Sequence, residues 1–261
     1  MKLFVLVLSD IHVSSDNDSV LGRAKTVGLT CSESARSADV CLIAVTGDLT
    51  YSAKKEQFDA VGSFLKAIKC FFEDEGCKRV EILTVPGNHD CSLDKDDLPR
   101  QRLIEGLIKS PSDAQNVKMV DACTEVQQNY FEFRAATTTL SPKYEDRLWA
   151  EYEIDIGGKQ VRLSAINASW MSSLHEKPGT LVFPIENYHD LLAEPVSARF
   201  VFLHHPLNWY VQGSYHPLRV ALRSHAAAIF SGHEHIPASG CVQDSDAGAS
   251  LFLRLQHCSL P

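Results

Sequence analysis

Residues 80–90, VEILTVPGNHD, join a run of strand-forming residues to a turn and a polar cluster. Val80 to Val85 is short and rich in β-branched residues, so it predicts a buried strand, which Pro86 and Gly87 end. Asn88 to Asp90 then follow at the carboxyl end of this strand. Ligands bind at that end of the strands in open α/β sheets, so the stretch indicates both a fold class and the place of a site.

Two earlier segments repeat this arrangement. Lys2 to Leu8 is an apolar run that leads into Asp10 and His12, and Val40 to Val45 leads into Asp48. Between the three runs, apolar residues recur at helical spacing. This β-α-β-α-β order predicts an α/β fold with a parallel sheet and right-handed crossovers.

The rest of the chain gives weaker but similar signals. A possible cap-like insertion covers about 91–148, and it contains two predicted helices. Two later strands flank Gly157 and Gly158, which is typical of a hairpin. The predicted ranges are helices at 98–108 and 124–137, strands at 149–156, 160–166, 200–203, 226–230 and 251–255, and a polar loop at 245–250.

The composition indicates a single domain, 1–261, with a large core. The chain has 261 residues, of which 44% are hydrophobic, so it can fold without disulfides. No apolar run approaches the length of a transmembrane helix, and residues 3–8 are too short for a signal sequence. Eight cysteines without a C-x-x-C pair favour reduced thiols in a cytoplasmic protein. The net charge of −8 argues against tight non-specific binding to polyanions, although bound divalent cations would add positive charge at a site.

Five clusters each place Asp, Asn or His after a strand-like run. Residues i and i+2 of an extended segment point the same way, so Asp10 and His12 can present their side chains to one location. The same holds for His233 and His235. Mixed carboxylate and imidazole ligands suit Mn, Fe, Zn or Ni better than Mg or Ca. The clusters therefore predict a site for a divalent transition metal.

Glycines stand at three of these strand exits. Gly47, Gly87 and Gly232 each precede a polar residue of the clusters. We expect either a positive φ or the close approach of another group at these positions, because glycine tolerates both.

Taken in order, the clusters resemble the motifs of the calcineurin-like metallophosphoesterase superfamily. The matching motifs are D-x-H (Asp10, His12), G-D (Gly47, Asp48), G-N-H-D (Gly87 to Asp90), a strand that ends in His204, and G-H-x-H (Gly232 to His235). They run across most of the chain. The resemblance implies an α/β four-layer αββα sandwich, in which helices flank two mixed sheets.

The resemblance also implies a binuclear centre for two divalent transition metal ions, with Mn favoured over Fe, Zn or Ni. The two sets of ligands would share Asp48, which would bridge the metals. The sets are Asp10, His12, Asp48 and His235 for one metal, and Asp48, Asn88, His204 and His233 for the other. A metal-bound hydroxide would then attack the phosphate ester, so that no Ser or Cys nucleophile is needed.

By the same resemblance, His89 would contact a phosphate oxygen or protonate the leaving group. Its orienting partner stays open, because Tyr51 stands where phosphoprotein phosphatases carry an acidic residue. We place Asp90 with His89 in the catalytic group, as a residue that supports it.

Two choices stay open in the sequence. His204 and His205 both follow a strand, and we favour His204 as the ligand because it continues the run that ends at Leu203. Trp209 and Tyr210 follow closely, and they either line a substrate cleft, where their rings can stack on a nucleobase, or pack in the core.

The predicted function is a phosphodiesterase that hydrolyses a nucleotide or nucleic-acid phosphodiester, since G-N-H-D with G-H-x-H resembles the cyclic-nucleotide phosphodiesterase and nuclease branches. A phosphomonoesterase, a phosphoprotein phosphatase or a nucleotide pyrophosphatase could use the same centre. A noncatalytic scaffold of the same fold is the third hypothesis. About 26 residues follow His235, so the chain can be a stand-alone enzyme or one module of a protein with additional C-terminal domains.

Overall fold

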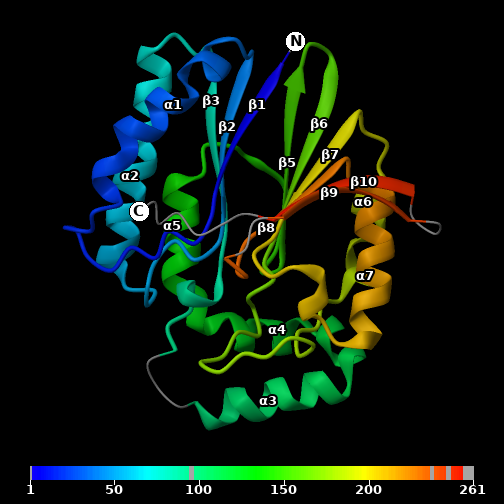
Figure 1. Ribbon diagram of the computed structural model, residues 1–261. Coiled ribbons are helices and arrows are strands. Elements are labelled where there is room, and N and C mark those ends of the chain that lie inside the picture. Colours follow the sequence, from blue (N-terminus) through cyan, green and yellow to red (C-terminus); the bar gives the residue numbers. More distant parts are fainter. Residues whose placement is uncertain (1, 94–96, 236–237, 245–247, 255–261) are drawn as a thin grey trace.

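Two β-sheets lie between layers of helices in the computed structural model of the protein (Figure 1). The structure describes residues 2–93, 97–235, 238–244 and 248–254. The polar loop predicted at 245–250 and the strand predicted at 251–255 fall partly outside these ranges. Their described parts, Gly248 to Arg254, belong to one strand.

The first sheet confirms the predicted parallel unit. Its order is β1-β2-β3, and both pairings are parallel. The pairings between its described residues are all parallel. The resemblance implied two mixed sheets, and only the second sheet is mixed. The strands are β1 (Leu3–Leu8), β2 (Val40–Thr46) and β3 (Val80–Val85).

The second sheet has the order β4-β5-β6-β7-β8-β10-β9 and mixes parallel with antiparallel pairs. The predicted hairpin is present, because Ile156 pairs with Lys159 across Gly157 and Gly158, which both have positive φ. The sequence did not predict the two edge strands β4 and β9. The seven strands are β4 (Pro142–Glu145), β5 (Trp149–Ile156), β6 (Lys159–Ile166), β7 (Ala198–Phe202), β8 (Ala228–Ser231), β9 (Ala238–Asp244) and β10 (Gly248–Arg254).

The helices α1, α2, α3 and α5 lie where the sequence predicted helices, whereas α4, α6 and α7 were not predicted. In α7, Gly213 and Pro217 weaken the helical signal although the backbone is helical. The α-helices are α1 (Ala24–Arg36), α2 (Lys55–Asp74), α3 (Leu98–Lys109), α4 (Val117–Thr124), α5 (Gln128–Thr137), α6 (His189–Ala193) and α7 (Gln212–His225). The 3-10 helices are η1 (Leu21–Arg23), η2 (Asn88–Asp90), η3 (Pro111–Gln115), η4 (Glu125–Gln127), η5 (Ile185–Tyr188) and η6 (Leu207–Trp209).

Three hydrophobic cores separate four layers, as the resemblance implied. Strand β2 shows the reason, since successive side chains of a strand point to opposite faces. Ile43 and Val45 pack with α1, α2 and α5, whereas Leu42 and Ala44 pack with β5, β6 and β7 of the second sheet. The third core lies between the second sheet and the helices α6 and α7, and it extends to α3 and α4. Burial on both faces explains why β2 reads as a continuous apolar run.

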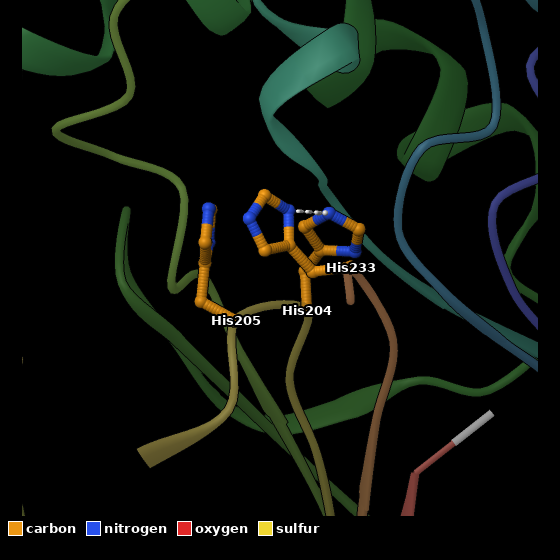
Figure 2. Close-up of side chains that lie close together, drawn as sticks. All are labelled: His204, His205 and His233. Carbon is orange, nitrogen blue, oxygen red and sulfur yellow. Dashed lines mark hydrogen bonds between the residues drawn. The ribbon is translucent and has the colours of Figure 1, made fainter. Parts of the chain in front are cut away.

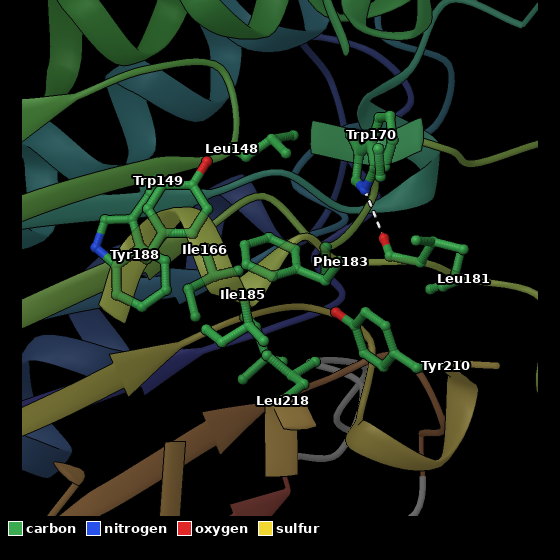
Figure 3. Close-up of a cluster of buried hydrophobic side chains, with 14 of the residues drawn as sticks. Leu148, Trp149, Ile166, Trp170, Leu181, Phe183, Ile185, Tyr188, Tyr210 and Leu218 are labelled. Atoms are coloured by element: carbon green, nitrogen blue, oxygen red, sulfur yellow. Dashed lines mark hydrogen bonds between the residues drawn. The ribbon is translucent and has the colours of Figure 1, made fainter. Parts of the chain in front are cut away.

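The third core is rich in aromatic residues (Figure 3). The rings of Trp149 and Tyr188 stack at 4.9 Å, and the Trp170 indole N–H donates to the carbonyl of Val182 at 2.8 Å. Trp170 and Tyr210 are both buried in this core. The core position therefore decides the open choice for Tyr210.

Within the described residues, the cysteines are free thiols. The helices found there are all too short or too polar to cross a membrane.

Candidate metal centre

The polar clusters meet where the carboxyl ends of β1, β2, β3, β7 and β8 come together, at the lower end of the sheets in Figure 1. Four groups of side chains there bring their ligand atoms within 4.8 Å of one another. The groups are Asp10, His12 and His235; His12, Asp48 and His89; Asp10, Asp48 and His204; and His204, His205 and His233.

The backbone of this region is left-handed at five of the seven predicted ligands. The values of φ are 55° for Asp10, 51° for His12, 51° for Asp48, 71° for His233 and 53° for His235. The argument from an extended segment was therefore wrong. Asp10 and His12 still lie in one group, whereas His233 and His235 belong to different groups. Left-handed residues other than glycine carry a conformational cost and cluster at functional sites, where the surrounding structure holds them in place.

The three glycines permit close approach, as predicted, and only Gly47 also needs its positive φ of 92°. A Cβ on Gly47 would lie 2.5 Å from His204 Nδ1. A Cβ on Gly87 would overlap Asp48, and one on Gly232 would overlap Ser9 Oγ. Side chains at these positions would displace the candidate ligands themselves.

Asp48 lies at the middle of the constellation. Its Oδ2 is 3.6 Å from His12 Nε2 on one side and 3.3 Å from His204 Nε2 on the other, and its Oδ1 accepts the backbone N–H of His89 at 2.8 Å. Burial opposes ionisation of Asp48, but the positive charges of His204 and His12 outweigh it and hold the pKa of this carboxyl below its usual range.

His204 and His233 face each other in the group that they form with His205 (Figure 2). His204 Nδ1 donates to the Thr46 carbonyl at 2.8 Å, so its other nitrogen, Nε2, is the one that offers a lone pair to a metal once the ring loses its second proton. Nε2 lies 3.2 Å from His233 Nδ1 and 3.1 Å from Asn88 Oδ1. Burial, followed by the charges of His205 and His204, lowers the pKa of His233 to about 2. Several electron-rich atoms therefore converge on one point.

His205 has other partners. Its Nε2 lies 2.8 Å from Glu176 Oε2, and its Nδ1 lies 3.3 Å from Ser169 Oγ. Both ring nitrogens are therefore occupied by protein atoms, whereas His204 Nε2 points at Asp48, Asn88 and His233. This geometry favours His204 as the ligand. Glu176 is a member of the site that the sequence did not reveal, because it lies in a loop outside every motif.

His89 is oriented by a backbone group. Its Nδ1 donates to the Tyr51 carbonyl at 2.8 Å, and its ring lies 4.6 Å from that of His12. The orienting partner of His89 is therefore the main chain of Tyr51. The residue type at position 51 did not reveal this partner, because every residue has a backbone carbonyl.

Asp90 joins two loops through its carboxylate. Its carboxylate accepts from the backbone N–H groups of Leu49, Thr50 and Gly87 and from the Thr50 hydroxyl, at 2.8–3.1 Å. Burial and the negative charge of Asp48 raise the pKa of Asp90 to about 6, although the backbone donors oppose this shift.

Trp209 forms one wall beside the group of His204, His205 and His233. Its ring packs edge to face on His233 with centroids 4.2 Å apart, and its indole N–H donates to Glu234 at 3.2 Å. Glu234 stands between the two histidines of G-H-x-H, so the same turn supplies candidate ligands and holds the adjacent aromatic ring.

Comparison with protein families agrees with this arrangement. The family model for calcineurin-like phosphoesterases matches residues 4–237, which is most of the chain and includes every predicted ligand. The chain belongs to the calcineurin-like phosphoesterase family. Members of this family are metal-dependent hydrolases of phosphate esters, and the Asp and His groups of this phosphoesterase could bind such metals.

Several solved structures are similar to this phosphoesterase. A dimetal phosphatase from Danio rerio is 12% identical, with 97% of this chain and 86% of that chain covered and a TM-score of 0.49. A phosphopantetheinyl hydrolase from Mycobacterium tuberculosis is 11% identical, with 98% and 90% covered and a TM-score of 0.44. A phosphatase from Mycoplasma pneumoniae is 10% identical, with 97% and 71% covered and a TM-score of 0.46. Curated proteins gave no match.

The donor set of the phosphoesterase fits divalent cations. Ligands about 2.1 Å from a shared ion lie roughly 3 to 3.5 Å from one another. The separations at His204 Nε2, which are 3.1, 3.2 and 3.3 Å, fall in this range. Lone pairs so close together repel unless a proton or a cation lies among them. In the absence of metal a proton takes this place: burial opposes the charge, but Asp48 and Asp10 raise the pKa of His204 to about 10.

Proposed function

We propose that this phosphoesterase hydrolyses a nucleotide or nucleic-acid phosphodiester at a binuclear metal centre bridged by Asp48. One observation carries the proposal: Asp48 Oδ2 lies between His12 Nε2 at 3.6 Å and His204 Nε2 at 3.3 Å, with a separate group of donors on each side. A carboxylate in this position can serve two cations at once.

Each side of Asp48 offers the ligands of one metal. On the first side, His235 Nε2 lies 3.2 Å from Asp10 Oδ1, and His12 belongs to the same group. On the second side, His233 Nδ1 lies 3.0 Å from Asn88 Oδ1, and His204 is close to both. We assign one Mn, Fe, Zn or Ni ion to each side, and we favour Mn for both.

Bound divalent cations supply Lewis acidity toward a phosphate oxygen and an acidified water as the nucleophile. The protein's own contribution is to place groups around the phosphate. His89 holds its Nδ1 proton on the Tyr51 carbonyl, so Nε2 is the nitrogen left for the substrate. When the ring carries a second proton, Nε2–H can donate to a phosphate oxygen or pass this proton to the leaving alcohol. We assign Asp90 a positioning role, because its carboxylate fixes the loops that carry Asp48 and His89.

The choice of a phosphodiester rests on the motifs. Phosphoprotein phosphatases continue the second motif as G-D-x-x-D-R-G, whereas this chain reads Gly47-Asp48-Leu49-Thr50-Tyr51. An exposed tyrosine therefore replaces the acidic residue of that branch. A phosphomonoesterase or a nucleotide pyrophosphatase is the second candidate, since the same donor set would serve either reaction.

The helices α3 and α4 lie at the end of the sheets that carries the polar clusters (Figure 1), so we propose that they form the cap. A cavity of about 800 Å³ separates α3 from the segment 171–181, and Glu176, the partner of His205, lines it. The third helix of the region 91–148, α5, packs on α2 instead and belongs to the sandwich.

With free thiols at the described cysteines, we place the protein in the cytoplasm.

The test is metal analysis followed by a substrate comparison. Elemental analysis of purified protein is expected to find close to two transition metal ions per chain after loading with Mn. Rates are then compared on bis(p-nitrophenyl) phosphate and on p-nitrophenyl phosphate. A clear preference for the monoester would overturn the phosphodiester assignment and leave the metal centre intact.

An Asp48→Asn variant tests the bridge itself. It is expected to lose metal and at least about a hundredfold in kcat/KM, because both groups of ligands share this side chain. Asp113→Asn, which changes an exposed aspartate on η3, is the matched control and should behave as wild type. An active Asp48→Asn protein with full metal content would refute the bridge. Absence of both metal and activity in the wild-type protein would favour the noncatalytic scaffold.

A further inference from the structure

The loop after Asp48 presents one aromatic ring to solvent beside His89. We infer that Tyr51 is a specificity-determining residue, whose ring stacks on an aromatic group of the substrate's leaving alcohol. The substrate class is then a phosphoester of an aryl or nucleoside group, as opposed to an aliphatic alcohol. This inference rests on the proposed function, because it concerns the substrate of the same site.

The backbone of Tyr51 is fixed on both sides. Its N–H donates to the Val13 carbonyl at 3.0 Å, and its carbonyl accepts from His89 Nδ1 at 2.8 Å. Val13 in turn forms a β-bridge with Thr50. The main chain of Tyr51 is therefore tied both to the segment that carries His12 and to the side chain that faces the phosphate.

The neighbours of Tyr51 are held as well. Thr50 is bound to Asp90 through its N–H and its hydroxyl, and Ser52 is bound to Gln57 Oε1 through its N–H at 3.0 Å. Ala53 has a left-handed φ of 53°, which is unfavourable for alanine. Its N–H donates to Thr50 Oγ1 at 3.0 Å, and its carbonyl accepts from Asn129 on α5 at 2.9 Å. Strain of this kind persists only where the surrounding contacts determine the conformation.

Tyr51 is 59% exposed, although the neighbouring residues are anchored. The ring centroid of Tyr51 lies 5.6 Å from that of His89 at an interplanar angle of 37°, which is a tilted contact and not a stack, so the exposed surface of the residue stays available to a ligand. A lone exposed tyrosine is common on protein surfaces and needs no explanation by itself. A rigid loop that holds an exposed aromatic face against the residue assigned to the leaving group is a preorganised binding surface.

The position of His89 decides which part of the substrate meets Tyr51. His89 Nε2 is the nitrogen left for the phosphate or the leaving oxygen, and the ring of Tyr51 lies directly beside that imidazole. The alcohol that departs next to His89 therefore extends over Tyr51. A planar group can stack there, whereas an aliphatic chain gains little from an aromatic face.

The test compares the response of two substrates to the same variants. Bis(p-nitrophenyl) phosphate is the aromatic diester, and glycerophosphoethanolamine is the aliphatic one. Tyr51→Ala is expected to lower kcat/KM on the aromatic diester by about tenfold or more, and to change the aliphatic diester by less than about twofold. Tyr51→Phe keeps the ring and should retain the preference, while Tyr51→Leu keeps only apolar bulk and should lose it. Tyr144→Leu, at another exposed tyrosine on β4, is the control and should leave both rates unchanged.

A binding measurement gives a readout that does not depend on turnover. Titration calorimetry of the metal-loaded protein should show tighter binding of phenylphosphonate than of methylphosphonate, and Tyr51→Ala should remove the difference. AMP and ribose 5-phosphate as competing ligands identify the source of the ring. A preference for AMP that depends on Tyr51 assigns a nucleobase, and its absence assigns a simple aryl group.

Two results would overturn the inference. Equal losses on the aromatic and the aliphatic diester would show that Tyr51 acts only by orienting His89, and unchanged rates on both would show that the ring has no role. If no phosphoester is hydrolysed by the loaded wild-type protein, the proposed function fails. The phosphonate comparison still decides then whether Tyr51 binds an aromatic group.

Discussion

Substitution of Gly87 by alanine tests whether the strand exits are shaped for Asp48. A Cβ on Gly87 would lie 2.7 Å from Asp48 Cγ, and closer still to Asp48 Oδ1 and to the backbone N of Asp48. Carbon atoms pack at about 3.5 to 4.0 Å, so the carboxylate must move by roughly 1 Å. A change of side-chain rotamer cannot relieve the overlap, because one of the atoms belongs to the backbone.

A displacement of this size has a predictable effect. A misplacement of about 1 Å at a reacting centre costs on the order of a hundredfold in rate, which corresponds to about 2.7 kcal/mol at the transition state. We expect Gly87→Ala to lower kcat/KM on bis(p-nitrophenyl) phosphate by this factor and to reduce the metal content. The assays are steady-state kinetics with Mn and elemental analysis of the loaded protein.

The matched control is Gly106→Ala in α3, where a Cβ would meet nothing within 4 Å. This helical position should gain about 0.5 to 1 kcal/mol in free energy of unfolding and keep full activity. A Gly87→Ala protein with wild-type metal content and wild-type kcat/KM would refute the claim that glycine is needed there for the approach of Asp48.

Three further predictions follow from buried groups. Burial opposes the charge of His204, but Asp48 and Asp10 raise the pKa of His204 to about 10 in the metal-free protein. A metal must then displace a proton, so its apparent affinity should rise with pH by up to about tenfold per unit around neutrality. Calorimetry in buffers of different ionisation enthalpy measures this proton release, and affinity independent of pH would contradict it. Asp90→Ala leaves three backbone N–H groups without their acceptor. It should lower the free energy of unfolding of the metal-free protein by about 2 to 4 kcal/mol, measured in urea. An unchanged free energy of unfolding would contradict the role of Asp90 between the loops. Arg199→Leu leaves the buried Glu151 carboxylate without its cationic partner and should cost about 3 to 5 kcal/mol in thermal unfolding. Arg102→Leu, at an exposed arginine of α3, is the control and should change the free energy of unfolding little.

The sequence by itself determined the order of the central elements and the set of candidate ligands. Apolar runs such as residues 40–45 and 80–85 are local signals, and buried strands of parallel sheets produce them whatever the rest of the chain does. Polar side chains such as Asp48 and Asn88 follow these runs because functional groups of α/β sheets gather at the carboxyl ends. Edge strand β4, with every residue exposed, carries no such pattern, and it was not predicted.

Only the tertiary structure decided the partners of these side chains. His205 pairs with Glu176, which is 29 residues away in a loop outside the motifs, and His204 turns instead to Asp48 and Asn88. His89 is oriented by the carbonyl of Tyr51, a backbone group that every residue type would supply. The left-handed backbone at Asp10 and His12 follows from contacts with the Asp48 loop, not from local preference. Side-chain direction and pairing depend on which distant segments pack together, and a linear pattern of residue types does not contain that distance information.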